Sequence, residues 1–250
     1  MGVLAVATTG LCLAVALPVV NVGAAAAAPR AVPRAPLSLP LGGAPGRTNT
    51  EYSGYFENLY GALTLTTTLT VPKVRCANHA TWGSQVGILA LMTSSGTQVE
   101  HGGGVEVGCS SPAGTAVYAA ALCDPDYAAG CGTPPGPVAP GDVVEVEVSA
   151  TGGCNPTCTS ASVTVTDTTQ DWSASWSGQA QSDVEAFVAL VGAAPVPDFG
   201  KVGVRDVTVN GAGFDGQRSS LADHNGNTLA RASALSQSKT SFSVTWVRAA

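Results

Sequence analysis

The sequence has few charged residues, few aromatic residues and almost no histidine. Lys, Arg, Asp and Glu make up 11% of the 250 residues, and aromatic residues make up 6%. The three histidines, His79, His101 and His224, show no metal-ligand spacing, so we expect neither a metal site nor a cofactor. The sequence also lacks the motifs of serine hydrolases, zinc peptidases, phosphate loops and dinucleotide-binding folds. These gaps argue against the commonest enzyme classes.

No window of the sequence shows a convincing helical period, and alternation of apolar and polar residues takes its place. This period of two runs along residues 63–71, 143–148, 162–166, 202–209 and 241–246. It is typical of strands that bury one face. Turn residues, mainly Gly, Pro and Asn, separate these segments. The sequence therefore predicts an all-β protein built as an antiparallel two-sheet sandwich.

No acidic residue precedes Glu51, and the chain after it is strongly acidic. The whole chain holds 17 acidic and 11 basic residues, and three of the basic residues come before Glu51. A basic face for nucleic acid or for an anionic membrane is therefore lacking, and we expect neither partner. Two explanations of the acidic surface stay open: solubility, and work at low pH, where fewer carboxylates are ionised.

Long apolar runs are missing except at the start of the chain. Residues 3–20 are apolar and lead into the alanine run 24–28, which predicts a secretory signal peptide over residues 1–28. No Lys or Arg precedes the run, so a retained membrane anchor is the alternative. Residues 29–50 hold five prolines and three arginines and predict a linker or short pro-segment. We expect residues 51–250 to form one secreted, monomeric domain that is free of the membrane.

Six of the seven cysteines follow the predicted signal peptide. An even number in an exported chain predicts disulfides, although the count alone leaves several pairings open. The pairs that we expect are Cys76–Cys109, Cys123–Cys131 and Cys154–Cys158. The last two would close short loops rich in Gly, Pro and Asn. Zinc binding by Cys154 and Cys158 is the alternative, but no second pair of cysteines or histidines accompanies them.

Short motifs that follow one another through the chain resemble those of a known family. They are Tyr52-Ser53-Gly54-Tyr55, Leu69-Thr70-Val71-Pro72 followed by Cys76, Val86-Gly87-Ile88, Pro140-Gly141-Asp142, Asp198-Phe199-Gly200-Lys201-Val202, Val209-Asn210-Gly211 and Ser241-Phe242-Ser243-Val244-Thr245-Trp246. Their order and spacing over residues 52–246 resemble the glutamic peptidases, or eqolisins. The resemblance implies a secreted, acid-acting endopeptidase with a polypeptide substrate. It also implies a sandwich of two curved antiparallel sheets, like the concanavalin-A-type jelly roll.

The resemblance also implies a catalytic pair. In such enzymes a Glu acts as general base on a water, and a Gln positions that water and donates to the oxyanion. Glu185 matches the Glu, and His101, two residues before Gly103, stands in the place of the Gln. Gln98 would serve only through a bulge, because positions 98 and 101 face opposite ways in a strand. We therefore expect Glu185 and His101 on neighbouring strands, on one face of one sheet.

Other positions depart from the family pattern. Gln85 and Leu89 stand where the family has Trp and Asp, and Ala120-Ala121-Leu122 stands where it has Trp-Tyr-Glu. These changes predict a shallower and drier groove. Protonated histidine is a good oxyanion donor, so both weak and lost activity stay open. The alternative function is a non-catalytic sandwich that binds peptide or glycan, with Trp172 and Trp176 as a candidate stacking platform for sugars.

Overall fold

The computed structural model describes most of the chain beyond residue 46. The described residues are 47–58, 61–94, 100–111, 113–123, 131–132, 136–154, 158–180 and 184–249. The chain divides into two units, Met1–Arg30 and Ala31–Ala250, and all described residues belong to the second. The predicted signal peptide and most of the predicted linker therefore lie outside the described residues.

Strands make up most of the described chain. In chain order they are β1 (Arg47–Asn49), β2 (Tyr52–Asn58), β3 (Leu63–Thr70), β4 (Gln85–Ser94), β5 (Glu100–Cys109), β6 (Ala116–Cys123), β7 (Cys131–Gly132), β8 (Val143–Thr151), β9 (Ser160–Asp167), β10 (Trp172–Gly178), β11 (Val184–Gly192), β12 (Lys201–Val209), β13 (Ala212–Gly213), β14 (Gln217–Ala222), β15 (Thr228–Ala232) and β16 (Phe242–Trp246). The one helical element among the described residues is the 3₁₀ turn η1 (His79–Thr81). No helix in this part of the chain is long and apolar enough to cross a membrane.

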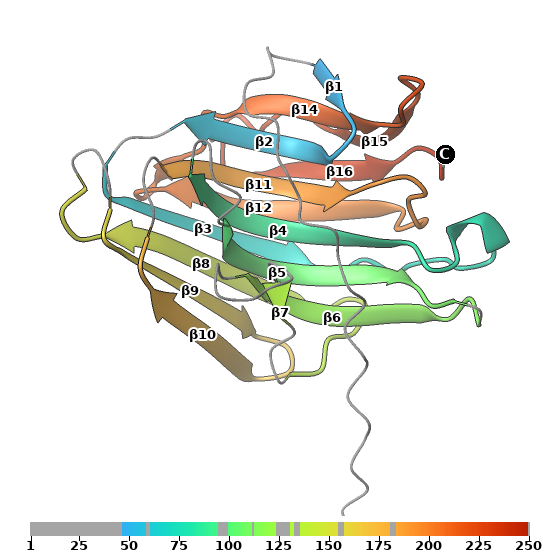
Figure 1. The fold of residues 1–250 in the computed structure, drawn as a ribbon, viewed down its shortest axis with the longest axis horizontal. Coiled ribbons are helices and arrows are strands. Elements are labelled where there is room, and N and C mark those ends of the chain that lie inside the picture. The colour runs from blue at the N-terminus through green and yellow to red at the C-terminus, as the bar shows by residue number, and fades with distance from the viewer. Residues whose placement is uncertain are drawn as a thin grey trace, which may run out of the picture. The chain divides into compact units, whose positions relative to one another are not determined.

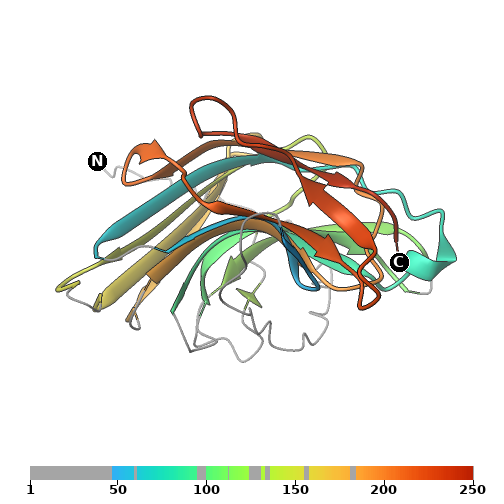
Figure 2. The ribbon, with the colours of Figure 1, turned by 90° about the horizontal axis from the view of Figure 1, so that it is seen from above.

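The strands form one hydrogen-bonded path that folds over into two layers. The path runs β10-β9-β8-β3-β12-β16-β15-β14-β2-β11-β4-β5-β6-β7, and its pairs are antiparallel. Strands β4, β5 and β6 contact β8 and β9 across the interior (Figures 1 and 2). We call β10-β9-β8-β3-β12 the back layer and β14-β2-β11-β4-β5-β6 the front layer. The predicted antiparallel two-sheet sandwich is confirmed.

The space between the layers holds the main hydrophobic core, which we call the interlayer core. Strand β8 shows why the alternating pattern builds it: Val144, Val146 and Val148 are buried, while Glu145 and Glu147 are exposed. A strand with this pattern sits stably only with its valine face covered. The largest fully buried side chains include Phe199, Phe214, Leu63, Leu65, Leu69, Ile88 and Met92.

The first strand begins before the predicted domain boundary at residue 51. Strand β1 lies within the predicted linker and pairs in parallel with Ser219–Leu221 of β14. Asn49 then fixes the entry into β2, because its Oδ1 accepts hydrogen bonds from the backbone N–H groups of Glu51 at 2.8 Å and Tyr52 at 2.7 Å. Three residues are too few for an alternating pattern to reveal, so the sequence did not mark this strand.

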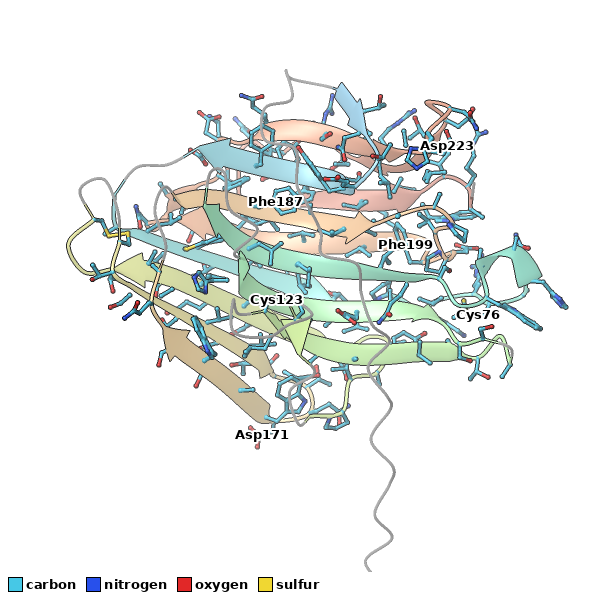
Figure 3. The ribbon with its side chains drawn as sticks, viewed as in Figure 1. Cys76, Cys123, Asp171, Phe187, Phe199 and Asp223 are labelled. Carbon is cyan, nitrogen blue, oxygen red and sulfur yellow. A yellow bond between two sulfur atoms is a disulfide. The ribbon has the colours of Figure 1, made fainter. Side chains whose placement is uncertain are left out.

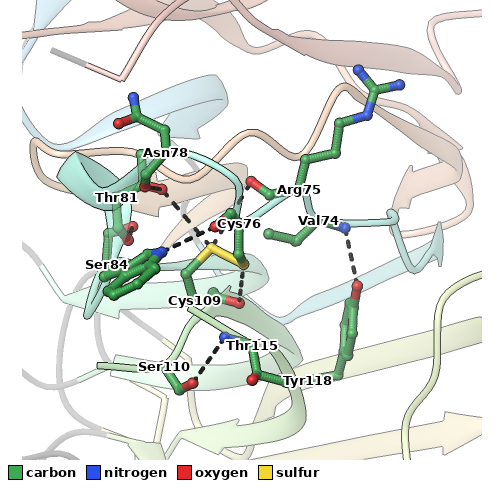
Figure 4. The surroundings of a disulfide bond; sticks show 12 residues. Val74, Arg75, Cys76, Asn78, Thr81, Ser84, Cys109, Ser110, Thr115 and Tyr118 are labelled. Atoms are coloured by element: carbon green, nitrogen blue, oxygen red, sulfur yellow. Dashed lines mark hydrogen bonds between the residues drawn. A yellow bond between two sulfur atoms is a disulfide. The ribbon is translucent and has the colours of Figure 1, made fainter. Parts of the chain in front are cut away.

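The three predicted disulfides are confirmed: Cys76–Cys109, Cys123–Cys131 and Cys154–Cys158. The first ties the segment after β3 to the end of β5 (Figure 4). The Nε1 of Trp82 donates a hydrogen bond to the carbonyl of Cys76 at 3.0 Å. The zinc alternative is wrong for Cys154 and Cys158, because their sulfur atoms are bonded to each other.

Candidate active site

Four neighbouring strands of the front layer place polar residues on one row. The register pairs Glu185 of β11 with Asn58 of β2 and with Thr93 of β4, and pairs Thr93 with Glu100 of β5. Residues that lie directly opposite each other in antiparallel strands belong to the same face of a sheet. Asn58, Glu185, Thr93 and Glu100 therefore form a continuous row across the sheet, which we call the polar row.

The next row on the same face is apolar. It contains Phe56, Phe187, Leu91 and Gly102, each two residues from a member of the polar row. The three large side chains belong to a cluster on the face of the front layer that points away from the interlayer core. We call it the outer apolar cluster; its members are Tyr52, Phe56, Leu89, Leu91, Ala121, Cys123, Phe187, Ala189 and Val191. Because strand positions alternate with a period of two, the polar row belongs to this outer face.

The front layer is bowed (Figure 2), and the outer apolar cluster has members on β2, β11, β4 and β6, among them Phe187 and Cys123 (Figure 3). Within it the ring of Tyr52 packs edge-on against the ring of Phe187, with 4.6 Å between the centroids. The polar row thus borders a packed aromatic surface at one end of these strands.

His101 belongs to the opposite face. It pairs with Met92, and Met92 pairs with Ala186, and both partners lie in the interlayer core. The imidazole is 5% exposed and stacks on Trp176 of β10, with 4.9 Å between the ring centroids and 20° between the planes. Two residues further along β5, Gly103 also faces the back layer, because a Cβ at this position would collide with Val165. His101 is therefore part of the packing between the layers.

The structure does not bring Glu185 and His101 together on one face, as we had expected from the sequence. Their positions are one residue out of register, and a slip of one residue reverses the face of a strand. They are also not on neighbouring strands, because β4 lies between β11 and β5. The alternative partner, Gln98, lies outside the described residues.

Glu100 is the residue on the outer face that our sequence analysis missed. It also stands two residues before a glycine, because Gly102, Gly103 and Gly104 follow one another. The spacing thus fits both Glu100 and His101. Glu100 and His101 differ in the face of the sheet on which they lie, and Glu100 shares the face of Glu185. The strand register decides this.

The predicted drier groove is supported at some of the positions that depart from the family pattern and not at others. Leu89 and Ala121 lie in the outer apolar cluster and are fully buried. Leu122 instead belongs to the interlayer core, so it does not line the outer face. Gln85 keeps a polar contact, since its Nε2 donates to the Oε2 of Glu106 at 2.6 Å.

The candidate sugar platform is wrong. Trp172 and Trp176 lie on the inner side of β10 and pack against the interlayer core. The Nε1 of Trp172 donates to the carbonyl of Pro137 at 2.8 Å. Stacking on a sugar needs an exposed ring face, and here Trp176 already stacks on His101.

A shallow groove of about 230 Å³ lies on the other side of the molecule, over the back layer. It is lined by Thr66, Thr67, Thr68, Glu145, Val146, Glu147, Thr164, Thr166 and Asp206. The hydroxyl of Thr66 is already hydrogen-bonded to that of Thr208, with 2.8 Å between the oxygens. Across the described residues, no group of three or more His, Cys, Asp or Glu is arranged to hold a metal ion. The polar row is the stronger candidate.

Two curved antiparallel layers, with a carboxyl-bearing row beside an apolar outer face, make this chain a β-sandwich protein. A sequence model of the Peptidase A4 family matches residues 50–246, and the chain belongs to this family. No protein in the curated set that we compared matches the chain significantly.

Solved structures of peptidases share the fold. Scytalido-glutamic peptidase with a transition state analog inhibitor aligns with a TM-score of 0.62 and 17% identity, over 79% of this chain and 98% of that chain. SCP-B, a member of the Eqolisin family in complex with the tripeptide Ala-Ile-His, aligns with a TM-score of 0.58, 17% identity and the same coverage. Aspergilloglutamic peptidase from Aspergillus niger gives a TM-score of 0.52 and 20% identity, over 66% of this chain and 99% of that chain.

Proposed function

We propose that this chain is an exported, acid-acting endopeptidase of the glutamic type, with Glu185 as its general base. The observation that carries the proposal is the position of Glu185 on the polar row, beside the outer apolar cluster and inside the span that matches the family. His101 has no part in it, because it packs between the layers.

The chemistry needs one water and one peptide bond. The carboxylate of Glu185 takes a proton from the water, and the water oxygen attacks the carbonyl carbon. The carboxyl then gives the proton to the amide nitrogen as the bond between carbon and nitrogen breaks, which leaves an acid and an amine. A hydrogen-bond donor on the same face has to stabilise the oxyanion that forms when the water attacks and that lasts until the bond between carbon and nitrogen breaks.

A polypeptide substrate and export are supported from two sides. Scytalido-glutamic peptidase is solved with a transition state analog inhibitor and SCP-B with a tripeptide, which favours a polypeptide substrate for this chain. Three disulfides suit an oxidising compartment outside the cytosol. The predicted signal peptide and the monomeric state stay predictions.

The direct test is hydrolysis of an unfolded protein between about pH 2 and pH 7, the range in which carboxyl groups and histidine titrate. We expect cleavage at acid pH that survives chelators and reagents for serine and cysteine. Glu185→Gln should abolish it, since the amide cannot accept a proton. Glu147→Gln is the matched control, because it makes the same chemical change on the exposed face of β8. Cleavage that persists in Glu185→Gln would rule out the role of Glu185.

A non-catalytic peptide-binding protein is the second candidate. It is favoured by the loss of polar and aromatic groups of the family pattern at Leu89 and Ala121, which are buried apolar residues here. Under this alternative, a labelled unfolded peptide would bind to the wild-type protein and be recovered intact across the whole pH range.

A further inference from the structure

Glu100 lies on the same row as Glu185, with one strand between them. Each pairs with Thr93 of β4, Glu185 from one side and Glu100 from the other. Two strand spacings put their backbone positions about 9–10 Å apart. Glu100 and Glu185 thus flank Thr93 on one face of the sheet.

The faces of β5 are marked independently of the register. His101 stacks on the back layer, and Gly103 approaches Val165 of that layer so closely that a Cβ would collide. Odd-numbered positions at this end of β5 therefore face the interior. Glu100, like Gly102, belongs to the outer face with Leu91 and Phe187.

The one Lys or Arg in the strands of the front layer is Arg218 of β14, which pairs with Tyr55, a residue of the interlayer core. Strands β2, β4, β5, β6 and β11 contain no Lys or Arg. The other titratable side chains on the outer face of these strands are Tyr52 and Glu106. Both lie on one row, about 20 Å along the strands from Glu100 and Glu185. Two carboxyl groups that approach each other resist double ionisation, so a pair on one row with no Lys or Arg on the strand between them favours a single shared proton over part of the acid range.

We infer that Glu100 is the second catalytic residue, so that this chain works with a pair of carboxyl groups; the inference rests on the proposed function. Ionised Glu185 takes a proton from water, and protonated Glu100 donates its proton to the carbonyl oxygen as the water oxygen bonds to the carbon. When the bond between carbon and nitrogen breaks, Glu185 protonates the amine, and the hydroxyl of the new acid returns a proton to Glu100. One water is consumed, and both residues end as they began.

The pair predicts a pH dependence that a single general base does not share. Activity should rise as the first carboxyl ionises and fall as the second does, which gives a bell-shaped profile of kcat/KM. Glu100→Gln keeps a donor but no longer titrates, so activity should persist and the fall on the high-pH side should vanish. Glu100→Ala removes the donor, and kcat should drop by about 100-fold.

The closing experiment measures coupling separately from catalysis. The carboxyl carbon of Glu100 is followed by ¹³C NMR from about pH 2 to pH 8 in wild type, Glu185→Gln and Glu147→Gln, alongside pH profiles of hydrolysis. We expect the midpoint of Glu100 to move to lower pH by at least about one pH unit in Glu185→Gln and to stay in place in Glu147→Gln. Circular dichroism checks that each variant is folded.

The outcomes separate the two proposals. Suppose that the wild type is active. If the midpoint of Glu100 is then unchanged in Glu185→Gln, or if Glu100→Gln has the wild-type pH profile, the carboxyl pair is overturned and the proposed peptidase function is not. A shifted midpoint in an inactive wild type overturns the proposed function, and with it the catalytic role of Glu100, although the two carboxyl groups are paired. A shifted midpoint together with loss of the high-pH fall supports both.

Discussion

Glu100 and His101 are adjacent in the chain and have opposite surroundings. One lies on the outer face with Glu185, and the other stacks on Trp176 between the layers. The family spacing of two residues before a glycine fits either residue, since three glycines follow. Gly102, Gly103 and Gly104 have no side chains whose burial would reveal the alternation of faces, so the nearest sequence signal is the alternation Val105-Glu106-Val107 further along the strand.

His101→Ala should destabilise the fold, because it empties a buried site beside Trp176. We expect the free energy of unfolding to fall by about 1–3 kcal/mol, measured by urea denaturation with tryptophan fluorescence. Ser175→Ala, on the exposed side of β10, is the control and should change the value by less than about 0.5 kcal/mol. A His101→Ala variant as stable as wild type would argue that the imidazole is not packed in the core.

Glu51 should make the fold less stable as the pH rises. Burial raises the pKa of Glu51 above its ordinary value, so the native state favours the protonated carboxyl. Its stabilising contribution is present below the unfolded pKa and is lost as the pH rises through the folded pKa. Glu51→Gln should therefore raise stability at pH 7 and match wild type at about pH 3. The gain should stay below about 1 kcal/mol, because the carboxyl is only partly buried.

Asp223 provides a control for the same urea titrations, because its effect on stability should change with pH in the opposite direction. Hydrogen bonds from the side chain and backbone of Asn227 hold the pKa of Asp223 below its ordinary value. Its contribution is present above the unfolded pKa and is lost as the pH falls through the folded pKa. Asp223→Asn should thus lower stability at pH 7 and have no effect at the lowest pH. Equal pH dependence in both variants would contradict these assignments.

At the level of strands, alternation identified those that bury one face and missed those that bury both. The patterns at 143–148 and 202–209 lie within β8 and β12. Strand β4, with Leu89 and Leu91 on one face and Ile88 and Met92 on the other, is buried on both sides and shows no alternation.

The disulfides should differ in their contribution to stability according to the length of chain they close. Cys76–Cys109 spans 33 residues and Cys154–Cys158 spans 4. The entropy of loop closure predicts losses of about 4 and about 2 kcal/mol when each pair is replaced by alanines. Thermal unfolding of the two double variants measures the order, and a thiol assay of each unfolded variant checks that the other bridges are intact. A reversed order would show that native contacts, rather than loop length, dominate.

The molecule as a whole is acidic, with a formal net charge of −6 and a sequence pI near 4.9. Near that pH the net charge approaches zero, and repulsion within the fold weakens. An acid-acting enzyme benefits from this, although solubility at neutral pH explains the same composition.

The mature protein should begin close to residue 29. The apolar run and the alanine run that follows it predict cleavage at this point during export. Mass spectrometry of the protein recovered from the medium of an expressing host measures the mature N-terminus. Recovery of full-length chain in the membrane fraction would instead support a retained anchor.

The β class and the family could be read from the sequence alone, and the cysteine pairs predicted from it are those of the structure. These depend on local alternation, on short loops such as Cys154–Cys158, and on the order of motifs along the chain. Three facts could be learned from the tertiary structure alone: β4 separates β5 from β11, His101 packs inward, and Glu100 shares a row with Glu185. The physical reason is that strand order and register arise from contacts between distant segments, and a shift of one residue exchanges the two faces of a strand.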